Sequence, residues 1–362
     1  MAAALRLPGN ASSIHAEGRA ARAVIEDARE QVATLAGAMA KSVVFTSGGT
    51  EAANLVLSPG FGRAGAAPTV RLLLSATEHA CVLQGHRFEA AAVERIPCGP
   101  DGLIDLAALG AALMRGGPAI LALQAANNET GVLQPVAEAA APTHAAGGIV
   151  VCDAVQLCGK LPCDIWALGA DALIVSAHKF GGPKGAGALV LASDSMHLTA
   201  PLLRGGGQER GLRAGTENIA AIAGFGAAAE AARSLEAEAS RLTGLRAAIE
   251  GSVRAAAPDA VFFGQTAPRL PNTASFAIPG ISAESLLIAL DLAGVAVSSG
   301  SACSSGKVTA SHVLAAMGVA SDMSRGALRV SLGWSTAADD AADFGERFAA
   351  VLARLRRARQ AA

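Results

Sequence analysis

Residues 173–185 read LIVSAHKFGGPKG, a short apolar run that leads directly into a polar turn rich in glycine. The lysine in this turn, Lys179, is a candidate for forming a Schiff base with a carbonyl cofactor. Most lysines are solvated surface residues, and the position of Lys179 alone also fits that interpretation. The residues that follow the neighbouring strands decide between the two.

Four other segments repeat this pattern of an apolar strand followed by polar or glycine-rich residues. The strands are predicted at 43–45, 70–74, 119–123 and 148–152, and the residues after them include TSGGTEAAN (46–54), SATEH (75–79), NNETG (127–131) and DAVQ (153–156). Open parallel sheets bind ligands outside the carboxyl ends of their strands. The five segments therefore predict an α/β domain with one shared crevice.

The turn at 46–54 is suited to holding a phosphate group. Gly48 and Gly49 let the backbone approach a ligand closely, and the helix predicted to begin there offers free N–H groups and a positive dipole end. A capped helix that binds nothing would show the same Gly-Gly-Thr sequence. The pattern is neither a P-loop nor the dinucleotide-binding fingerprint.

Three single polar residues stand at the ends of the other strands, and each has a structural alternative. His79 can stack as a flat ring or move protons, but it also fits a structural role at a helix start. Asn128 is a favoured turn residue whatever the function. Asp153 follows a strand that looks buried, where an unpaired carboxylate is costly. It therefore needs a cationic partner, such as the pyridinium nitrogen of pyridoxal phosphate, unless it caps a helix.

Together these motifs resemble those of the cysteine desulfurases, in the class V aminotransferase branch of the fold-type I pyridoxal phosphate enzymes. The matching phrases cover nearly the whole chain and include NASSIHAEGR (10–19), FTSGGTE (45–51), TEH (77–79), NNETG (127–131), DAVQ (153–156), SAHKFGGPKG (176–185), GGGQERGLRAGTEN (205–218), SGSACSSG (299–306) and RVSLG (329–333). The resemblance implies a large domain with a mostly parallel sheet flanked by helices, a smaller C-terminal α+β domain, and pyridoxal 5′-phosphate as the cofactor.

The resemblance also implies a role for each residue near the cofactor ring. Lys179 would hold the cofactor as a Schiff base, His79 would stack on the pyridine ring, and Asp153 would pair with the ring nitrogen. Gln156 would hydrogen-bond the phenolic oxygen. Asn128 would contact the cofactor and the substrate.

The phosphate of the cofactor would lie in a second set of residues that the resemblance identifies. The backbone of Gly49 and Thr50 would surround it, together with Ser176 and His178. Thr216 matches a threonine that the partner subunit supplies to this phosphate site in the family. The match implies an obligate homodimer.

Arg329 would bind the carboxylate of the substrate, a task for which the planar guanidinium group is well suited. Asn128 would help on the same side. Without the other motifs, Arg329 would be interpreted as an ordinary arginine that follows a helix.

Cys303 lies in a loop of small residues, SSGSACSSGK (298–307), a composition that indicates access and not burial. The resemblance implies that its thiolate takes the sulfur of L-cysteine as a persulfide and that L-alanine is released. Only the thiolate is competent, so Cys303 needs a lowered pKa or a nearby base, for which His79 is the candidate. The remaining cysteines lie in or beside apolar runs and are predicted to be small buried residues: Cys81, Cys98, Cys152, Cys158 and Cys163.

The long spacing from Cys303 to Ser311 resembles the NifS/IscS type of desulfurase, which has an extended catalytic loop. Such loops deliver sulfur to an acceptor, typically an iron-sulfur scaffold protein, although a thiolation enzyme is an equal alternative as recipient. Cys303 is also expected to be a transient iron-sulfur ligand with a scaffold partner, and no other metal site is predicted.

The composition agrees with a soluble enzyme of the cytoplasm. The chain has 362 residues, of which 52% are hydrophobic, and a formal net charge of −1, so it shows no basic footprint for nucleic acid. Six cysteines without a CxxC pair give neither a zinc signature nor a disulfide framework. No apolar stretch approaches the ~20 residues that a membrane span needs.

Two domains are predicted, a large cofactor-binding domain at 1–237 and a small domain at 238–362 that carries the Cys303 loop. A helical stretch over 227–249 is expected to bridge them. Within the small domain, strands are predicted at 274–278, 295–298 and 328–332, and helices at 283–292 and 337–359.

The start of the chain departs from the family pattern. Family members usually carry some two dozen residues before the segment that matches 10–19, and the expected explanation is a start codon assigned too late. A truncated pyridoxal phosphate-binding protein without activity is one alternative function. A selenocysteine lyase or another class V enzyme is the other, and the position of Cys303 favours the desulfurase.

Overall fold

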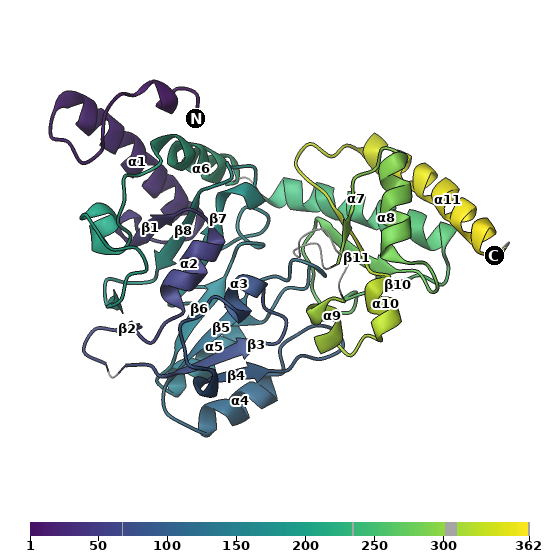
Figure 1. Cartoon of the computed structure of the whole chain (residues 1–362), viewed down its shortest axis with the longest axis horizontal. Coiled ribbons are helices and arrows are strands. Elements are labelled where there is room, and N and C mark those ends of the chain that lie inside the picture. The colour runs from purple at the N-terminus through teal and green to yellow at the C-terminus, as the bar shows by residue number, and fades with distance from the viewer. Residues whose placement is uncertain (67, 234, 301–309, 361–362) are drawn as a thin grey trace. The chain divides into compact units, whose positions relative to one another are not determined.

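The computed structural model describes residues 1–66, 68–233, 235–300 and 310–360 of the chain (Figure 1). The chain divides into two compact units. The first contains Met1–Ile96, Asp105–Ala126 and Gln134–Leu235, and the second contains Pro97–Ile104, Asn127–Leu133 and Glu236–Ala362. None of the helices in the described ranges is long and apolar enough to cross a membrane.

A seven-stranded sheet forms the centre of the first unit, with the strand order β1-β8-β7-β6-β5-β3-β4. The strands are β1 (Val43–Thr46), β3 (Arg71–Ser75), β4 (Val93–Ile96), β5 (Ala119–Gln124), β6 (Ile149–Asp153), β7 (Ala172–Ser176) and β8 (Gly187–Leu191). All neighbouring pairs are parallel except the two that β8 makes with β1 and β7. The predicted α/β fold with a mostly parallel sheet is confirmed.

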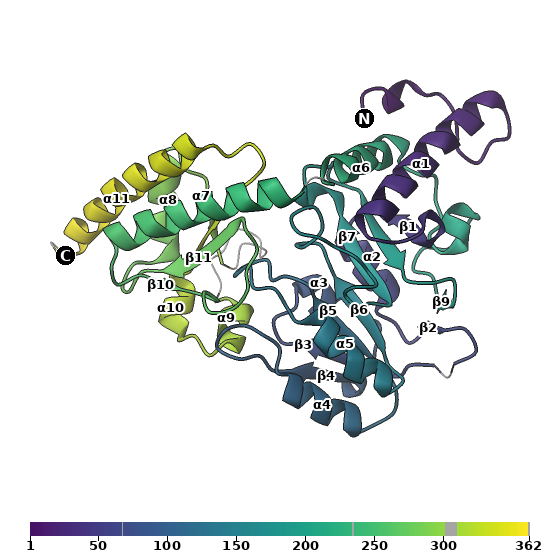
Figure 2. The same cartoon turned by 180° about the vertical axis from the view of Figure 1, so that it is seen from behind.

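Helices cover both faces of this sheet, as Figures 1 and 2 show. On one face, α2 (Gly49–Val56) buries Ala52, Leu55 and Val56 against alternate residues of the strands, such as Leu72 and Ile120. On the other face, α5 (Val136–Ala145) packs on β5 and β6 beside α4 (Leu106–Met114). Strands that are buried on both faces consist of continuous apolar runs, and these runs allowed the strands to be predicted from the sequence.

The remaining elements of the first unit lie at its periphery. Two long helices, α1 (Ala16–Leu35) and α6 (Ile219–Ala231), pack on each other. The others are short: α3 (Ala80–Leu83), the antiparallel pair β2 (Phe61–Arg63) and β9 (Met196–Leu198), and the 3₁₀ turns η1 (Ala4–Arg6), η2 (Ala40–Ser42), η3 (Ala90–Ala92), η4 (Ala177–Lys179) and η5 (Gln208–Gly211).

The second unit is built on a four-stranded antiparallel sheet with the order β10-β11-β13-β12. Its strands are β10 (Val261–Phe262), β11 (Thr273–Ala277), β12 (Ser298–Ser299) and β13 (Leu328–Ser331), and its helices are α7 (Leu235–Ala256), α8 (Ala283–Leu292), α9 (His312–Ala316), α10 (Ser321–Arg325) and α11 (Ala338–Gln360). The apolar faces of α7, α8 and α11 share one core with the sheet (Figure 2). Phe276 and Phe348 meet in it, with ring centroids 5.8 Å apart.

Two element predictions were wrong in detail. The helical stretch expected at 227–249 is not continuous, because α6 ends at Ala231 and α7 begins at Leu235. Alanine favours helix on both sides of this break, whereas the buried faces differ: α6 buries Phe225 in the first unit, and α7 buries Ile249 in the second. The strand expected at 295–298 is reduced to the two residues of β12.

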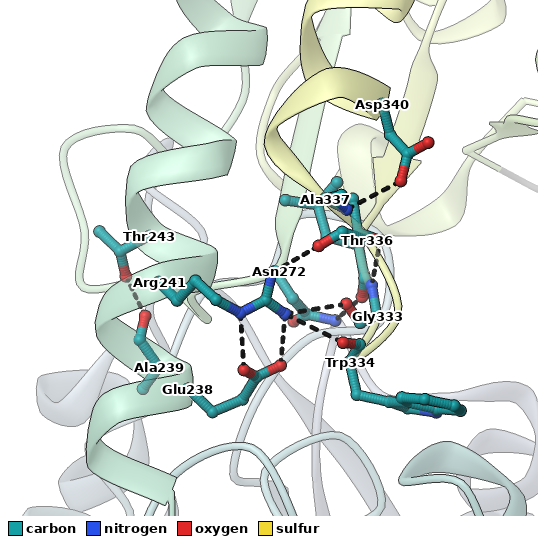
Figure 3. Close-up of polar contacts among 11 residues, drawn as sticks. Glu238, Ala239, Arg241, Thr243, Asn272, Gly333, Trp334, Thr336, Ala337 and Asp340 are labelled. Atoms are coloured by element: carbon teal, nitrogen blue, oxygen red, sulfur yellow. Dashed lines mark hydrogen bonds and ion pairs between the residues drawn. The ribbon is translucent and has the colours of Figure 1, made fainter.

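Arg241 of α7 fixes the segment that links β13 to α11, as Figure 3 shows. Its guanidinium group pairs with Glu238 one turn earlier and also donates to the carbonyl oxygens of Gly333, Trp334 and Thr336. The linking segment is therefore held at the point where β13 ends.

Candidate active site

The polar residues predicted to form the crevice of the large domain come together at one edge of the seven-stranded sheet. β1, β3, β5, β6 and β7 run in the same direction, because β1 and β7 are both antiparallel to β8. Their carboxyl ends therefore share this edge. The residues that follow these ends in the first unit are the turn 46–50, His79, the segment 153–156 and the turn 176–179.

Glycines let the turn after β1 lie close against its neighbours. A Cβ on Gly49 would come 2.9 Å from Val155 Cγ2 and 3.6 Å from the Cβ of Ser176, so the first turn of α2 lies beside β7. A Cβ on Gly187 would come 2.6 Å from the backbone of Gly48. These approaches bring the N–H groups at the start of α2 beside Ser176, whose Oγ is 2.9 Å from His178 Nδ1.

Lys179 occupies the last position of η4 and is exposed together with His178. The pKa of His178 is lowered by the partial burial of its ring and, to a smaller extent, by the charges of Lys179, Lys184 and Lys160. These three lysines, here called the lysine cluster, give this end of the sheet a positive potential. Such a potential favours an anionic group such as a phosphate.

Asp153 ends β6 with a buried carboxylate. Among the described residues, its one hydrogen bond comes from the backbone N–H of Val155 to Oδ1, at 3.0 Å. Burial raises the pKa of Asp153 to about 6, against the lowering effects of that bond and of the Lys179 charge. The residues after Asp153 form a turn and no helix, so it is not a helix cap.

His79 caps the short helix α3, so its structural alternative is observed. Its Nδ1 accepts the backbone N–H of Cys81 at 3.1 Å and lies 3.0 Å from the sulfur of Cys81. Because Nδ1 accepts, the proton of the neutral ring is on Nε2. His79 in this tautomer is a hydrogen-bond donor at Nε2, and acting as a base there would require the other tautomer.

Sequence reasoning missed three residues that lie beside these groups. Cys81 also hydrogen-bonds Thr50, and burial together with the charges of Asp153 and Glu78 raises its thiol pKa to about 12. Glu78 is buried, and burial followed by the charge of Asp153 raises its pKa well above the ordinary value. Lys160 donates hydrogen bonds to Gln156. Glu78 lies inside the TEH motif, but its contacts and those of Cys81 and Lys160 are seen only in the structure.

The predicted substrate residues Arg329 and Asn128 lie together in the second unit. Arg329 of β13 donates through Nη1 to the backbone oxygen of Asn128 at 2.6 Å. Asn127 Oδ1 holds the adjoining turn by accepting the N–H groups of Glu129 and Thr130, at 2.8 and 2.9 Å. The guanidinium group is therefore anchored on one side.

Thr216 lines a small cavity of the first unit, with a volume of 180 Å³, that also includes Ser47 and Arg213. Arg213 pairs with Glu51 at 2.8 Å, and Glu51 accepts the N–H of Ser47 at 2.9 Å. The segment that carries Thr216 is thus tied to the turn after β1. Cys303 lies outside the described residues.

The residues of the first unit fit pyridoxal phosphate on chemical grounds. A buried carboxylate with a single hydrogen bond inside the described ranges suits a protonated pyridine nitrogen. The glycine turn and the lysine cluster suit a phosphate, and the exposed amine of Lys179 is of the type that forms a Schiff base.

Comparisons with known proteins agree with this chemistry. The aminotransferase class-V family profile matches residues 4–344, and the chain belongs to that family. It is 40% identical over 371 residues to an IscS-like cysteine desulfurase of Mycobacterium tuberculosis. That alignment covers 100% of this chain and 94% of that protein. It is 44% identical over 338 residues to a cysteine desulfurase of Cereibacter sphaeroides, with 91% of this chain and 85% of that protein covered.

The fold is also similar to solved structures. A NifS-like protein from Rickettsia africae superposes with a TM-score of 0.87 at 32% sequence identity, covering 97% of this chain and 93% of that chain. The resemblance stated from the motifs is therefore confirmed at the level of the family and of the fold-type I architecture.

Proposed function

We propose that this protein is a pyridoxal phosphate-dependent cysteine desulfurase that converts L-cysteine to L-alanine and a protein-bound persulfide. The observation that carries the proposal is the placement of Asp153 and Lys179 at the ends of adjacent strands, beside the glycine turn at 46–50. The names of relatives that are 40% and 44% identical support the same activity.

When bound, the cofactor supplies an electron sink for charge that develops on the amino acid substrate. Asp153 would keep the ring nitrogen protonated, because a buried carboxylate stabilises a positive charge beside it. Gln156 would donate to the phenolic oxygen, and His79 would lie against the ring. Gly49 and Thr50 would hold the phosphate with Ser176 and His178.

Lys179 has two tasks in this proposal. Its Nζ would bind the carbonyl carbon of the cofactor, exchange that position with the amino group of L-cysteine, and then move the proton at the substrate Cα. Arg329 would bind the substrate carboxylate, with its orientation set by the bond from Nη1 to Asn128.

Cys303 would act as the nucleophile. Its thiolate attacks the sulfur of the bound substrate, so an S–S bond forms at Cys303 while the bond between that sulfur and the substrate Cβ breaks. The electron pair of the broken bond stays with the carbon skeleton, which takes a proton and leaves as L-alanine.

Our proposal extends to the assembly in which the protein works. Two chains would form a homodimer in which Thr216 completes the phosphate site of the partner. The persulfide would pass to an iron-sulfur scaffold or another acceptor protein in the cytoplasm. The IscS-like name of the Mycobacterium tuberculosis relative supports a role in iron-sulfur assembly.

The test is L-alanine and persulfide formation from L-cysteine by the purified wild type, Cys303→Ala and Lys179→Ala. Both variants are expected to lose turnover, while the Cys303→Ala protein keeps the visible absorption band of the cofactor and responds spectrally to L-cysteine. A wild type that binds the cofactor but makes no alanine would reject the desulfurase activity and leave a binding role. Faster turnover of L-selenocysteine would favour the lyase alternative.

A further inference from the structure

Lys160 has no role in the desulfurase mechanism proposed above. It is largely buried in the turn that follows β6, and its Nζ donates to the backbone oxygen of Gln156 at 2.7 Å and to Gln156 Oε1 at 3.3 Å. Gln156 is the residue expected to contact the phenolic oxygen of the cofactor. Lys160 is therefore one hydrogen bond away from that contact.

Burying the ammonium group of a lysine costs free energy, because the charge loses its hydration. Loss of hydration, together with the like charge of Lys179 nearby, lowers the pKa of Lys160 to about 8. The charge of Cys158 acts in the opposite direction and is the smallest of the three causes. Within the described ranges Lys160 forms no salt bridge, and its two hydrogen bonds both go to Gln156.

The chemistry of the two side chains fixes the orientation of the amide. An ammonium group donates hydrogen bonds and cannot accept them, whereas a carboxamide has one oxygen that accepts and one NH₂ that donates. The oxygen of Gln156 must therefore face Lys160, because the flipped amide would set two donors against each other. The NH₂ group is left to donate elsewhere.

A donor is what the phenolic oxygen requires. This oxygen carries negative charge in the Schiff-base form of the cofactor and accepts hydrogen bonds. We propose, in an inference that rests on the proposed function, that Lys160 is a positioning residue that holds the Gln156 carboxamide with its NH₂ group available to this oxygen.

The proposal predicts that Lys160 and Gln156 act as one unit. Residues in one hydrogen-bond network show non-additive effects in a double-mutant cycle. We expect Lys160→Met and Gln156→Leu each to weaken pyridoxal phosphate binding about tenfold, the effect of losing one hydrogen bond to a charged group. The double variant should bind no more weakly than either single variant.

The experiment measures pyridoxal phosphate binding to the full chain by titration of the visible absorption band, and it also records the wavelength of that band. Both single variants are expected to shift the wavelength in the same direction, and the double variant should shift it no further. Lys160→Arg, which also only donates, should restore most of the affinity. The matched control is Lys184→Met, which removes an exposed lysine of the same cluster.

Two results would overturn the proposal. One is a loss of cofactor affinity in the double variant that equals the sum of the losses in the two single variants. The other is a loss in Lys184→Met as large as that in Lys160→Met, which would mean that Lys160 contributes only its positive charge. Thermal unfolding of each variant identifies misfolding, and Lys160→Arg still tests the proposal if Lys160→Met does not fold. Because cofactor affinity and band position are the readouts, they decide the role of Lys160 even if the wild type forms no alanine and the desulfurase proposal fails.

Discussion

Ser311 donates a 2.5 Å hydrogen bond to the buried carboxylate of Glu129, although the two residues are 182 positions apart in the sequence. Glu129 Oε2 also lies 3.4 Å from the position that a Cβ on Gly300 would take. Burial raises the pKa of Glu129, while Ser311, His312 and Arg329 lower it. One carboxylate thus meets residues on both sides of the segment 301–309 as well as the predicted substrate arginine.

Replacing Glu129 tests what this contact contributes to stability. Glu129→Ala leaves the buried hydroxyl of Ser311 without its acceptor, so we expect a loss of about 1–3 kcal/mol in the free energy of unfolding. Glu129→Gln keeps an acceptor of the same shape and should lose less. Urea unfolding measures both variants, and equal stability of wild type and Glu129→Ala would show that the bond contributes nothing.

The raised pKa of Asp153 predicts how the cofactor-free protein responds to pH. Because the folded pKa of about 6 exceeds the ordinary value of 3.8, the folded state binds the proton more tightly than the unfolded state. The resulting stabilisation is complete below pH ~4 and is lost as the pH rises through ~6. Its magnitude is on the order of 3 kcal/mol.

Asp153→Asn should remove this pH dependence. Without cofactor, the variant is expected to be more stable than the wild type at pH 8 and nearly equal to it at pH 4, as measured by urea unfolding. It should bind pyridoxal phosphate more weakly, because the ring nitrogen loses its anionic partner. If the unfolding free energy of the wild type depends on pH in the same way as that of Asp153→Asn, the raised pKa of Asp153 is contradicted.

Gly49→Ala tests the close approach of the glycine turn at 46–50 to its neighbours. The added methyl group would meet Val155, so we expect overpacking to cost about 1–3 kcal/mol and cofactor affinity to fall. Gly110→Ala in α4 is the matched control, because its Cβ would meet nothing within 4 Å. That control should gain about 0.5–1 kcal/mol, since alanine favours helix. Similar behaviour of the two variants would show that the contact at Gly49 is unimportant.

Glu209 holds the segment before Thr216 against β1. It accepts two hydrogen bonds from Arg29, at 2.7 and 2.8 Å, and one from the backbone of Phe45 at 2.8 Å. Glu209→Ala leaves the buried guanidinium group of Arg29 with only the more exposed Glu26 as its anion, so we expect a loss of about 3–5 kcal/mol in unfolding free energy.

Asp194→Ala is the control for that prediction. Asp194 pairs with Lys41 on the surface, and both side chains are more than half exposed. Loss of such a pair should cost at most about 1 kcal/mol. Urea unfolding measures both variants. Comparable losses of unfolding free energy in Glu209→Ala and Asp194→Ala would mean that the buried pair of Arg29 and Glu209 stabilises the fold no more than a surface pair does.

The fold could be predicted from sequence because the strands of the large sheet are buried on both faces. Five apolar runs, each followed by polar residues, gave both the elements and the shared edge where the site residues collect. The break between α6 and α7 escaped prediction because alanine-rich sequence favours helix throughout. β12 escaped as well, since two small serines form it and its pairing with β13 decides its length.

The site could be predicted only where a motif spans consecutive residues. Asp153 ends β6, and His79 and Lys179 follow the ends of β3 and β7 within a few residues, so their positions followed from the strands. Lys160 and Glu78 matter through what they touch, namely Gln156 and the backbone N–H of Gln124. Such contacts depend on how turns and strands meet in space, which periodicity does not reveal.

The lysine cluster at the ends of β6 and β7 has a consequence for the rate at which the cofactor is acquired. The chain as a whole carries a formal charge of only −1, so its net charge adds little repulsion of an anion to the local field of Lys160, Lys179 and Lys184. Electrostatic steering of a doubly negative phosphate ester toward this edge should speed its encounter with the protein and fade as salt shortens the Debye length, about 8 Å at physiological ionic strength. Inorganic phosphate and sulfate, attracted by the same field, would then compete with the cofactor for this edge of the sheet.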